Sequence, residues 1–245
     1  MISAARTAIA LLFAVTATPL GALIFFPWTW LVGNADALYG TAMWIARIGL
    51  RLAGVRVEVE GRERIDPATT YIFMCNHVSN LDPPILLVNL PRRSSVLVKK
   101  ELFQVPILGR AMRLGDLVPV DRRNREAAVN SMRDAEAVMS RGLNMMVFPE
   151  GTRSRDGRLL PFKKGPFYLA IDSGVPVVPV TILGSETLMP KGGTLIRPGT
   201  VRLVFHNPLL PSLFSDKEGL IAATQREIAS ALPASLREAD LHTAS

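Results

Sequence analysis

A chain of 245 residues is long enough to bury the core of one large domain, or of one domain with an appendage. Its single cysteine excludes an intrachain disulfide and is typical of a reducing compartment. The net charge of +7 indicates an anionic partner: a nucleic acid, an anionic membrane or a phosphate-bearing substrate. No nucleic-acid partner is expected, because the sequence contains no recognisable nucleic-acid-binding module, zinc-finger spacing or aromatic-basic interleaving.

The first predicted element is an uncharged apolar segment between Arg6 and Asp36, which is longer than the roughly 20 residues that a membrane-spanning helix needs. Three interpretations compete: a spanning helix, a cleaved signal peptide, and an interfacial or re-entrant helical pair broken at Pro19, Gly21 and Pro27. A retained anchor is favoured over a signal peptide. The segment exceeds a normal signal-peptide core, no A-x-A cleavage site closes it, and Trp28 and Trp30 at its far end suit a membrane interface.

Residues 37–54 predict a second helix, with apolar residues on one side and Arg47 and Arg51 one turn apart. Two interpretations of this helix stay open: it lies on the bilayer surface, or it packs against the globular domain. Residues 1–54 are predicted to form a membrane-anchoring helical segment. The arginines that follow the apolar segment indicate, by the positive-inside rule, that the main domain faces the cytoplasm from the cytoplasmic membrane.

From residue 55 onwards, short β-rich runs alternate with helical patterns. The runs begin at Val55, Tyr71, Ser94, Gly115, Asn144, Pro176 and Thr200. The clearest helical pattern covers residues 125–142, and a capping box formed by Ser215 and Glu218 is expected to open a helix near the C-terminus. The alternation predicts an α/β domain over residues 55–245, with a largely parallel, mixed central sheet flanked by helices.

The stretch "CNHVSNLDPP", residues 75–84, places His77 directly after a predicted strand and five residues before Asp82. Open α/β sheets bind their ligands at the carboxyl ends of strands. In a tight loop, Asp82 can accept the Nδ1 proton of His77 and leave Nε2 as a general base. Asp82 also suits the N-cap of the next helix, with Pro83 at its first position, and its two oxygens can serve both roles. The spacing alone favours a structural histidine, because such pairs are frequent.

Two further strand-end loops contain basic and hydroxyl side chains. The stretch "FPEGTRSRDG" brings Glu150, Gly151, Thr152 and Arg153 into a turn whose guanidinium can hold a phosphate with two hydrogen bonds. A charged surface loop is the alternative interpretation, and it is preferred for residues 155–158. After "GDLVPV", Arg122 lies nearest the strand and is expected to point toward the same edge of the sheet.

Together these loops resemble those of the membrane-associated 1-acylglycerol-3-phosphate acyltransferases, within the wider glycerolipid acyltransferase family. "NHVSNLD" matches the family's NHxSxxD block and "FPEGTRS" matches its third block in full, while "GDLVPVDR" and "VPVVPV" resemble its second and fourth blocks. "KKEL", which contains Lys100, resembles a lesser signature. The similarity runs in order from about residue 55 to residue 205, with one departure at Pro119, where the family often has a bulky apolar residue.

The resemblance implies an enzyme that acylates lysophosphatidate to phosphatidate. His77 would deprotonate the free hydroxyl as it attacks the thioester carbonyl of acyl-CoA or acyl-carrier protein, and Asp82 would stabilise the imidazolium. Substrate binding would fall to Arg122, Arg153 and Lys100, together with the loop residues Glu150, Gly151 and Thr152. The implied partners are a membrane lipid acceptor, the acyl donor as co-substrate, and the bilayer. No cofactor is expected, and no metal site, because one histidine and one carboxylate are too few ligands.

Four alternatives stay open. Cys75 is a candidate acyl carrier, although a cysteine that ends a buried strand is normally inert. Ser79 is a candidate hydrolase nucleophile, although the sequence has no G-x-S-x-G elbow. The third alternative is an acyltransferase with another acceptor: glycerol-3-phosphate, another lysophospholipid or a lyso-ornithine lipid. The fourth alternative is a non-catalytic lipid-binding membrane protein. Such a protein, however, would not need the pair of His77 and Asp82.

Overall fold

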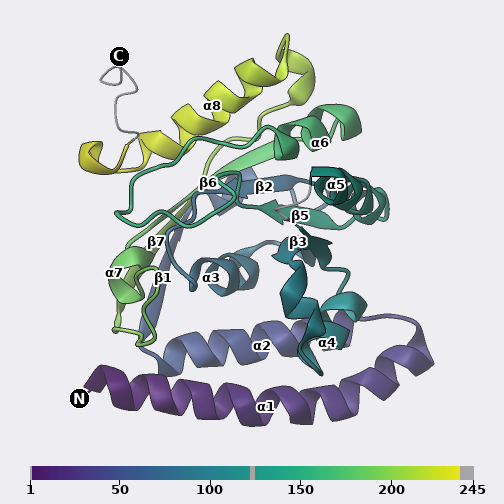
Figure 1. Cartoon of the computed structure of the whole chain (residues 1–245), viewed down its shortest axis with the longest axis vertical. Coiled ribbons are helices and arrows are strands. Elements are labelled where there is room, and N and C mark those ends of the chain that lie inside the picture. The colour runs from purple at the N-terminus through teal and green to yellow at the C-terminus, as the bar shows by residue number, and fades with distance from the viewer. Residues whose placement is uncertain (1, 122–124, 238–245) are drawn as a thin grey trace.

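Seven strands form one sheet within residues 2–121 and 125–237, the part of the chain that the computed structural model describes (Figure 1). Their order across the sheet is β1-β7-β6-β2-β5-β3-β4. The strands are Val55–Glu60 (β1), Ile72–Cys75 (β2), Ser94–Lys99 (β3), Val118–Val120 (β4), Asn144–Val147 (β5), Val177–Leu183 (β6) and Gly199–Phe205 (β7). All seven predicted β-rich runs are therefore confirmed as strands.

The direction of the strands brings the predicted functional loops to one edge of the sheet. Five neighbouring strands, β6, β2, β5, β3 and β4, run parallel to one another. Strand β7 runs antiparallel to β6 and parallel to β1, so these two strands point the other way. The sheet is mixed and largely parallel, as predicted. The edge where the five parallel strands end, and where β1 and β7 begin, is called the carboxyl edge below.

Helices cover both faces of the sheet. Within the described residues the α-helices are Ile2–Val32 (α1), Asp36–Leu52 (α2), Asp82–Asn89 (α3), Leu108–Leu114 (α4), Arg125–Ser140 (α5), Gly165–Ser173 (α6), Ser185–Leu188 (α7) and Lys217–Ser230 (α8). Figure 1 shows α5, α6 and α8 on one face, with α3 and α2 on the other and α1 outside α2. The predicted flanking of the sheet by helices is confirmed.

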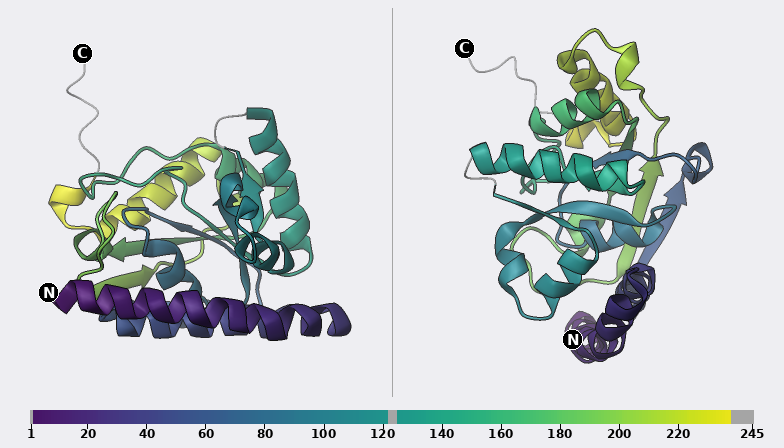
Figure 2. Two further views of the ribbon diagram at one scale, coloured as in Figure 1. Left: turned by 60° about the horizontal axis from the view of Figure 1, so that its bottom comes forward. Right: turned by 90° about the vertical axis from the view of Figure 1, so that its right-hand side faces the viewer.

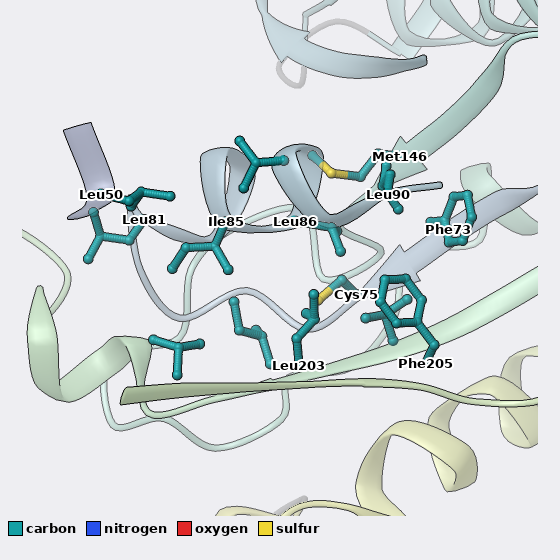
Figure 3. Close-up of a cluster of buried hydrophobic side chains, with 14 of the residues drawn as sticks. Leu50, Phe73, Cys75, Leu81, Ile85, Leu86, Leu90, Met146, Leu203 and Phe205 are labelled. Atoms are coloured by element: carbon teal, nitrogen blue, oxygen red, sulfur yellow. The ribbon is translucent and has the colours of Figure 1, made fainter. Parts of the chain in front are cut away.

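The central strand β2 is buried on both faces, and its side chains divide between two apolar clusters because successive residues of a strand point to opposite sides. Phe73 and Cys75 pack with side chains of α2 and α3, as Figure 3 shows. Ile72 and Met74 pack with side chains of α5, α6 and α8 on the other face. The loop that follows β2 therefore starts from one of the most firmly packed parts of the molecule.

Helix α1 is continuous over 31 residues, so one of the three interpretations of the apolar segment, a helical pair broken at Pro19, Gly21 and Pro27, is wrong. It lies lengthwise along α2 (Figure 2). The ring of Phe13 meets that of Trp44 edge-on at 5.9 Å between centroids, and Thr7 hydrogen-bonds the backbone of Ile196. This lateral packing keeps the helix intact across Pro19. By length and composition α1 is able to cross a membrane.

Helix α2 belongs to the globular body, which confirms one of the two interpretations of residues 37–54. It packs against α3 and β1, and Leu50 and Ala53 lie in the same apolar cluster as Phe73. Arg47 donates a hydrogen bond of 2.9 Å to the backbone carbonyl of Val88. The free side of α1, in contrast, exposes large apolar side chains: Ile9, Leu12, Val15, Leu23, Ile24, Trp30 and Leu31.

One predicted helix start is wrong by a residue. The N-cap of α8 is Asp216, whose carboxylate accepts the backbone N–H of Gly219 at 2.8 Å. The predicted capping box required Ser215 in that position. An aspartate caps a helix at least as well as a serine does, so the two adjacent candidates compete, and the chain uses the second.

Candidate active site

His77 and Asp82 make the contact that the resemblance to the acyltransferase family implied, although their spacing alone favoured a structural histidine. His77 follows β2 and Asp82 is the first residue of α3, and Nδ1 of the imidazole lies 2.8 Å from Oδ2 of the carboxylate. The Asp82 side chain is fully buried, while 12% of the His77 side chain is exposed. A carboxylate can only accept here, so Nδ1 carries the proton and Nε2 is left as an acceptor. The pair has the arrangement of a general base and its orienting acid.

The predicted role of Asp82 as a helix cap is wrong. The N-cap position of α3 is Leu81, and no side chain caps this helix. Oδ2 of Asp82 instead accepts the backbone N–H groups of Val78 and Ser79, each at 2.7 Å. The carboxylate turns back into the loop because these two amides and the imidazole all point at one oxygen. A buried carboxylate needs such donors, since leaving it without hydrogen bonds is very costly.

Ser185 completes the surroundings of Asp82, and sequence reasoning missed it. Its hydroxyl donates to Oδ1 of Asp82 at 2.5 Å from the first turn of α7, 103 residues further along the chain. Ser185 is itself fully buried. The sequence does carry one indication: the pair Gly184 and Ser185 directly follows β6, which ends at the carboxyl edge. Ser185 is a positioning residue, since it acts on the imidazole through Asp82.

The loop after β5 lies directly against the loop after β2. The ring of Phe148 stacks on the imidazole of His77, with 4.0 Å between centroids and 19° between planes. Glu150 accepts the backbone N–H of His77 at 2.6 Å through Oε1, and Ser154 donates its backbone N–H to the carbonyl of His77 at 2.8 Å. The two blocks "NHVSNLD" and "FPEGTRS" thus meet at one place on the carboxyl edge.

Glu150 is a second buried carboxylic acid, with 2% of the residue exposed. Its Oε2 accepts the backbone N–H of Leu160 at 3.0 Å, so backbone amides occupy both oxygens. The contacts therefore assign Glu150 to joining the two loops; its predicted part in substrate binding stays a prediction. Burial raises the pKa of Glu150 to about 8, aided by the charge of Asp82 and opposed by the two amide hydrogen bonds.

Gly151 has φ of +71°, a conformation that side chains with a Cβ rarely adopt. A Cβ at this position would also lie 3.4 Å from Cγ of Lys163. Glycine therefore allows the chain to turn immediately after Glu150, so that Thr152 and Arg153 follow directly after the turn in the loop after β5.

Arg153 and Lys191 bring two cations to this loop. Within the described residues, Nη1 of Arg153 is buried and has no hydrogen-bond partner. The ammonium of Lys191 lies 2.6 Å from the carbonyl oxygen of Arg153 and 3.5 Å from Oγ1 of Thr152. Sequence reasoning missed Lys191, because it follows α7 and comes close only through the fold. Two cations and a hydroxyl at one loop are suited to binding a phosphate.

The remaining predicted binding residues lie toward β3 and β4. Lys100 follows β3 and forms an ion pair of 2.5 Å with Asp121, which follows β4. Arg122 lies outside the described residues. Between this side and the loop after β5 runs a largely apolar groove of about 420 Å³, which side chains of β3, β4, β5 and α5 line: Leu97, Val120, Val147, Phe148 and Met132. Its size and lining suit the apolar part of a ligand.

The two alternative nucleophiles, Cys75 and Ser79, and the histidine His206 are engaged elsewhere. Cys75 is fully buried, and burial raises the pKa of its thiol well above the ordinary value, which makes an acyl-carrying thiolate unfavourable. The hydroxyl of Ser79 donates to the carbonyl of Met189 at 2.7 Å and accepts the N–H of Leu81, so it braces the loop. His206 hydrogen-bonds Thr181 inside the protein. The expectation of no metal stays a prediction.

Comparison with known proteins gives consistent results. The Acyltransferase family model matches residues 56–183. The 1-acyl-sn-glycerol-3-phosphate acyltransferases of Cocos nucifera and Limnanthes douglasii are 32% and 34% identical over 188 residues, which is 76% of this chain. This chain spans 60% and 66% of their lengths. The crystal structure of the 1-acyl-sn-glycerophosphate (LPA) acyltransferase PlsC from Thermotoga maritima superposes with a TM-score of 0.78 at 28% identity, covering 93% of this chain and 95% of that one.

The raised pKa of Glu150 predicts how stability depends on pH. Between the ordinary value of 4.5 and about 8, the folded protein binds one more proton at this carboxyl than the unfolded chain does. The stabilisation is therefore complete below about 4.5 and is lost as the pH rises to about 8. Relative to Glu150→Gln, the wild type should lose up to about 1.4 kcal/mol of unfolding free energy per pH unit in this window.

Urea denaturation of both proteins between pH 5 and pH 8 measures the difference. Asp156→Asn is the control, because the backbone N–H of Arg158 holds the pKa of Asp156 below 3.8, so its titration lies outside this range. Parallel curves for wild type and Glu150→Gln would contradict the assignment.

Proposed function

The chain belongs to the acyltransferase family, and from this we propose that it transfers a fatty acyl group from acyl-CoA or acyl-carrier protein to the free hydroxyl of 1-acylglycerol-3-phosphate, giving phosphatidate. The observation that carries the proposal is the meeting of the His77–Asp82 pair with the "FPEGTRS" loop at one edge of the sheet. A base and a phosphate-binding loop side by side suit an acceptor that carries a hydroxyl and a phosphate on one short glycerol backbone.

In the proposed reaction His77 acts as the general base. Nε2 takes the proton of the acceptor hydroxyl while that oxygen bonds to the thioester carbonyl carbon. The tetrahedral intermediate then collapses, the carbon–sulfur bond breaks, and the imidazolium returns the proton to the leaving thiolate. Asp82 favours the step because its buried carboxylate lies 2.8 Å from the ring nitrogen that keeps its proton throughout.

We further propose that cations of the same edge hold the acceptor phosphate. Arg153 and Lys191 are the first candidates, because a buried nitrogen of Arg153 has no hydrogen-bond partner among the residues that the structure describes, and Lys191 lies beside Thr152. Lys100 and Arg122 are expected on the side of β3 and β4. The groove beside Phe148 is available to an apolar part of a substrate. Binding through the phosphate would supply proximity and orientation for the proton transfer.

Residues 1–54 are proposed to hold the enzyme on the cytoplasmic face of the membrane. We favour an interfacial position of α1 over a spanning one, because spanning would separate it from α2 and break the contacts of Thr7 with Ile196 and of Phe13 with Trp44. An interfacial helix buries one apolar side in the bilayer and keeps the other on the protein. The exposed apolar side of α1 has this character.

Replacing the proposed base tests the function directly. His77→Ala should lower kcat by about 10²- to 10⁴-fold, the usual contribution of a general base, and should leave lysophosphatidate binding nearly unchanged. Lysophosphatidate-dependent release of free thiol from acyl-CoA measures turnover. Turnover near the wild-type rate would refute the base assignment, and activity that ignores lysophosphatidate but requires another acceptor would refute the substrate.

The proposed phosphate contacts predict a different kinetic effect. Arg153→Ala and Lys191→Met should each raise the KM for lysophosphatidate, by roughly tenfold to hundredfold for a charge-assisted hydrogen bond of about 1.5–3 kcal/mol. Arg155→Ala is the matched control, since Arg155 is exposed in the same loop and is assigned to the surface. An unchanged KM in either variant would remove that residue from the phosphate site.

Ser185→Ala should separate positioning from stability. Losing the hydrogen bond to Asp82 should lower kcat roughly tenfold with little change in either KM, because only the orientation of the base is affected. The control is Ser95→Ala, which removes an equally short hydrogen bond from another fully buried serine, to the carbonyl of Asp116. Equal losses of kcat in the two variants, at equal losses of stability, would show that Ser185 has only a structural role.

A further inference from the structure

A polar hollow of about 550 Å³ lies outside the proposed active site, where α1, α2 and the beginnings of β1 and β7 come together. Three arginines from three different elements line it: Arg6 of α1, Arg51 of α2 and Arg56 of β1. Because β1 and β7 begin at the carboxyl edge, the hollow lies on the same edge of the sheet as His77. None of the residues that line it belongs to the catalytic loops.

The three guanidinium groups have no anionic partner within the described part of the chain, where neither an ion pair nor a side-chain hydrogen bond joins any of them to a carboxylate. Other arginines of this protein do pair: Arg93 with Asp36, and Arg202 with Glu60. Three like charges around one hollow repel each other, although water and salt weaken the repulsion because all three residues are exposed. An anion in the hollow would replace that repulsion with attraction.

Gly54 allows the first of these arginines to lie against the protein. Its φ is +83°, and a Cβ there would lie 2.6 Å from Nη1 of Arg6 and 2.8 Å from Cβ of Pro198. The carbonyl of Gly54 also accepts the N–H of Gly199 at 3.1 Å, which joins the beginnings of β1 and β7 beneath the hollow. A side chain at position 54 would push the Arg6 guanidinium away from the other two.

The position of the hollow identifies the kind of anion. Arg6 lies near the start of α1, whose free side exposes Ile2, Ile9 and Leu12. When α1 lies in the membrane interface with this apolar side in the bilayer, the guanidinium of Arg6, which points away from that side, lies at the depth of the lipid headgroups. Headgroup phosphates are the anions present at that depth, and guanidinium groups bind phosphate oxygens in pairs.

We propose that Arg6, Arg51 and Arg56 form a binding site for the phosphate headgroup of an anionic membrane lipid, which fixes the amino-terminal end of α1 and the carboxyl edge at the bilayer surface. The proposal rests on the interfacial position of α1 but not on the acyl-transfer reaction. It gives the anchor a polar contact in addition to its apolar side, so that the active-site edge has a defined orientation to the membrane.

Vesicle binding by the full chain tests the site. The triple variant Arg6→Gln, Arg51→Gln, Arg56→Gln is compared with a control that removes the same charge from three exposed arginines elsewhere: Arg62→Gln, Arg133→Gln, Arg226→Gln. Co-sedimentation is measured with phosphatidylcholine vesicles and with vesicles that also contain phosphatidylglycerol. The wild type and the control should prefer the anionic vesicles. The triple variant of the hollow, called the hollow variant below, should show a preference for anionic vesicles that is about 10- to 100-fold weaker. It should bind phosphatidylcholine vesicles as the wild type does.

Three results would overturn the proposal. An equal loss in the control would show that net surface charge alone is responsible, and an unchanged preference would remove the site. In detergent micelles with soluble acyl-CoA, a raised KM for the donor in the hollow variant would assign the three arginines to the phosphates of coenzyme A.

The double variant Arg51→Gln, Arg56→Gln keeps the test valid if the triple variant unfolds. A wild type that binds vesicles but does not transfer acyl groups would count against the proposed function and not against this site.

Discussion

The buried carboxylate of Asp82 is the group on which the geometry of the active site depends. Burying a carboxylate is costly unless hydrogen-bond donors surround it, and this one accepts from the imidazole of His77, two backbone amides of the same loop and the hydroxyl of Ser185. Three of these donors come from consecutive residues of the loop after β2, and the fourth comes from the start of α7. The loop after β2 and the start of α7 must therefore both be in place before the carboxylate is stable, and the imidazole is oriented as a result.

Glu150 couples this arrangement to the loop after β5. Its two oxygens accept one amide from each side, at His77 and Leu160, so the loop after β5 cannot move independently of the loop after β2. The two acids differ in their donors: Asp82 is surrounded by four and Glu150 by two. The charge of Asp82 adds to burial in raising the pKa of Glu150. The Glu150 carboxyl therefore keeps its proton to a higher pH than an exposed glutamate does.

The side of the protein proposed to face the membrane borders the same edge. Helices α1 and α2 lie under the sheet (Figures 1 and 2), and the hollow at Arg6, Arg51 and Arg56 opens where β1 and β7 begin. Under the proposed function, an acceptor lipid that enters from the bilayer would meet His77 and the loop after β5 without leaving the surface. On this view the basic net charge of the chain serves two sites, one for the phosphate of the substrate and one for a headgroup of the surrounding membrane.

Local patterns were enough to predict the seven strands and the mixed parallel sheet, because alternating apolar residues act over short stretches of chain. The contact of His77 with Asp82 was expected from the resemblance to the acyltransferase family, since the spacing of the two residues alone favoured a structural histidine. The roles of Ser185 and Lys191 were not predictable in this way. Both lie more than 30 residues from the groups they contact, and the order of the strands alone brings them there. The same is true of the unbroken α1, which packs along α2 across its prolines, and of the three arginines, which three different elements bring to one hollow. Periodicity determines which segments become strands and helices, whereas contacts between distant segments depend on how the whole sheet buries its two apolar faces.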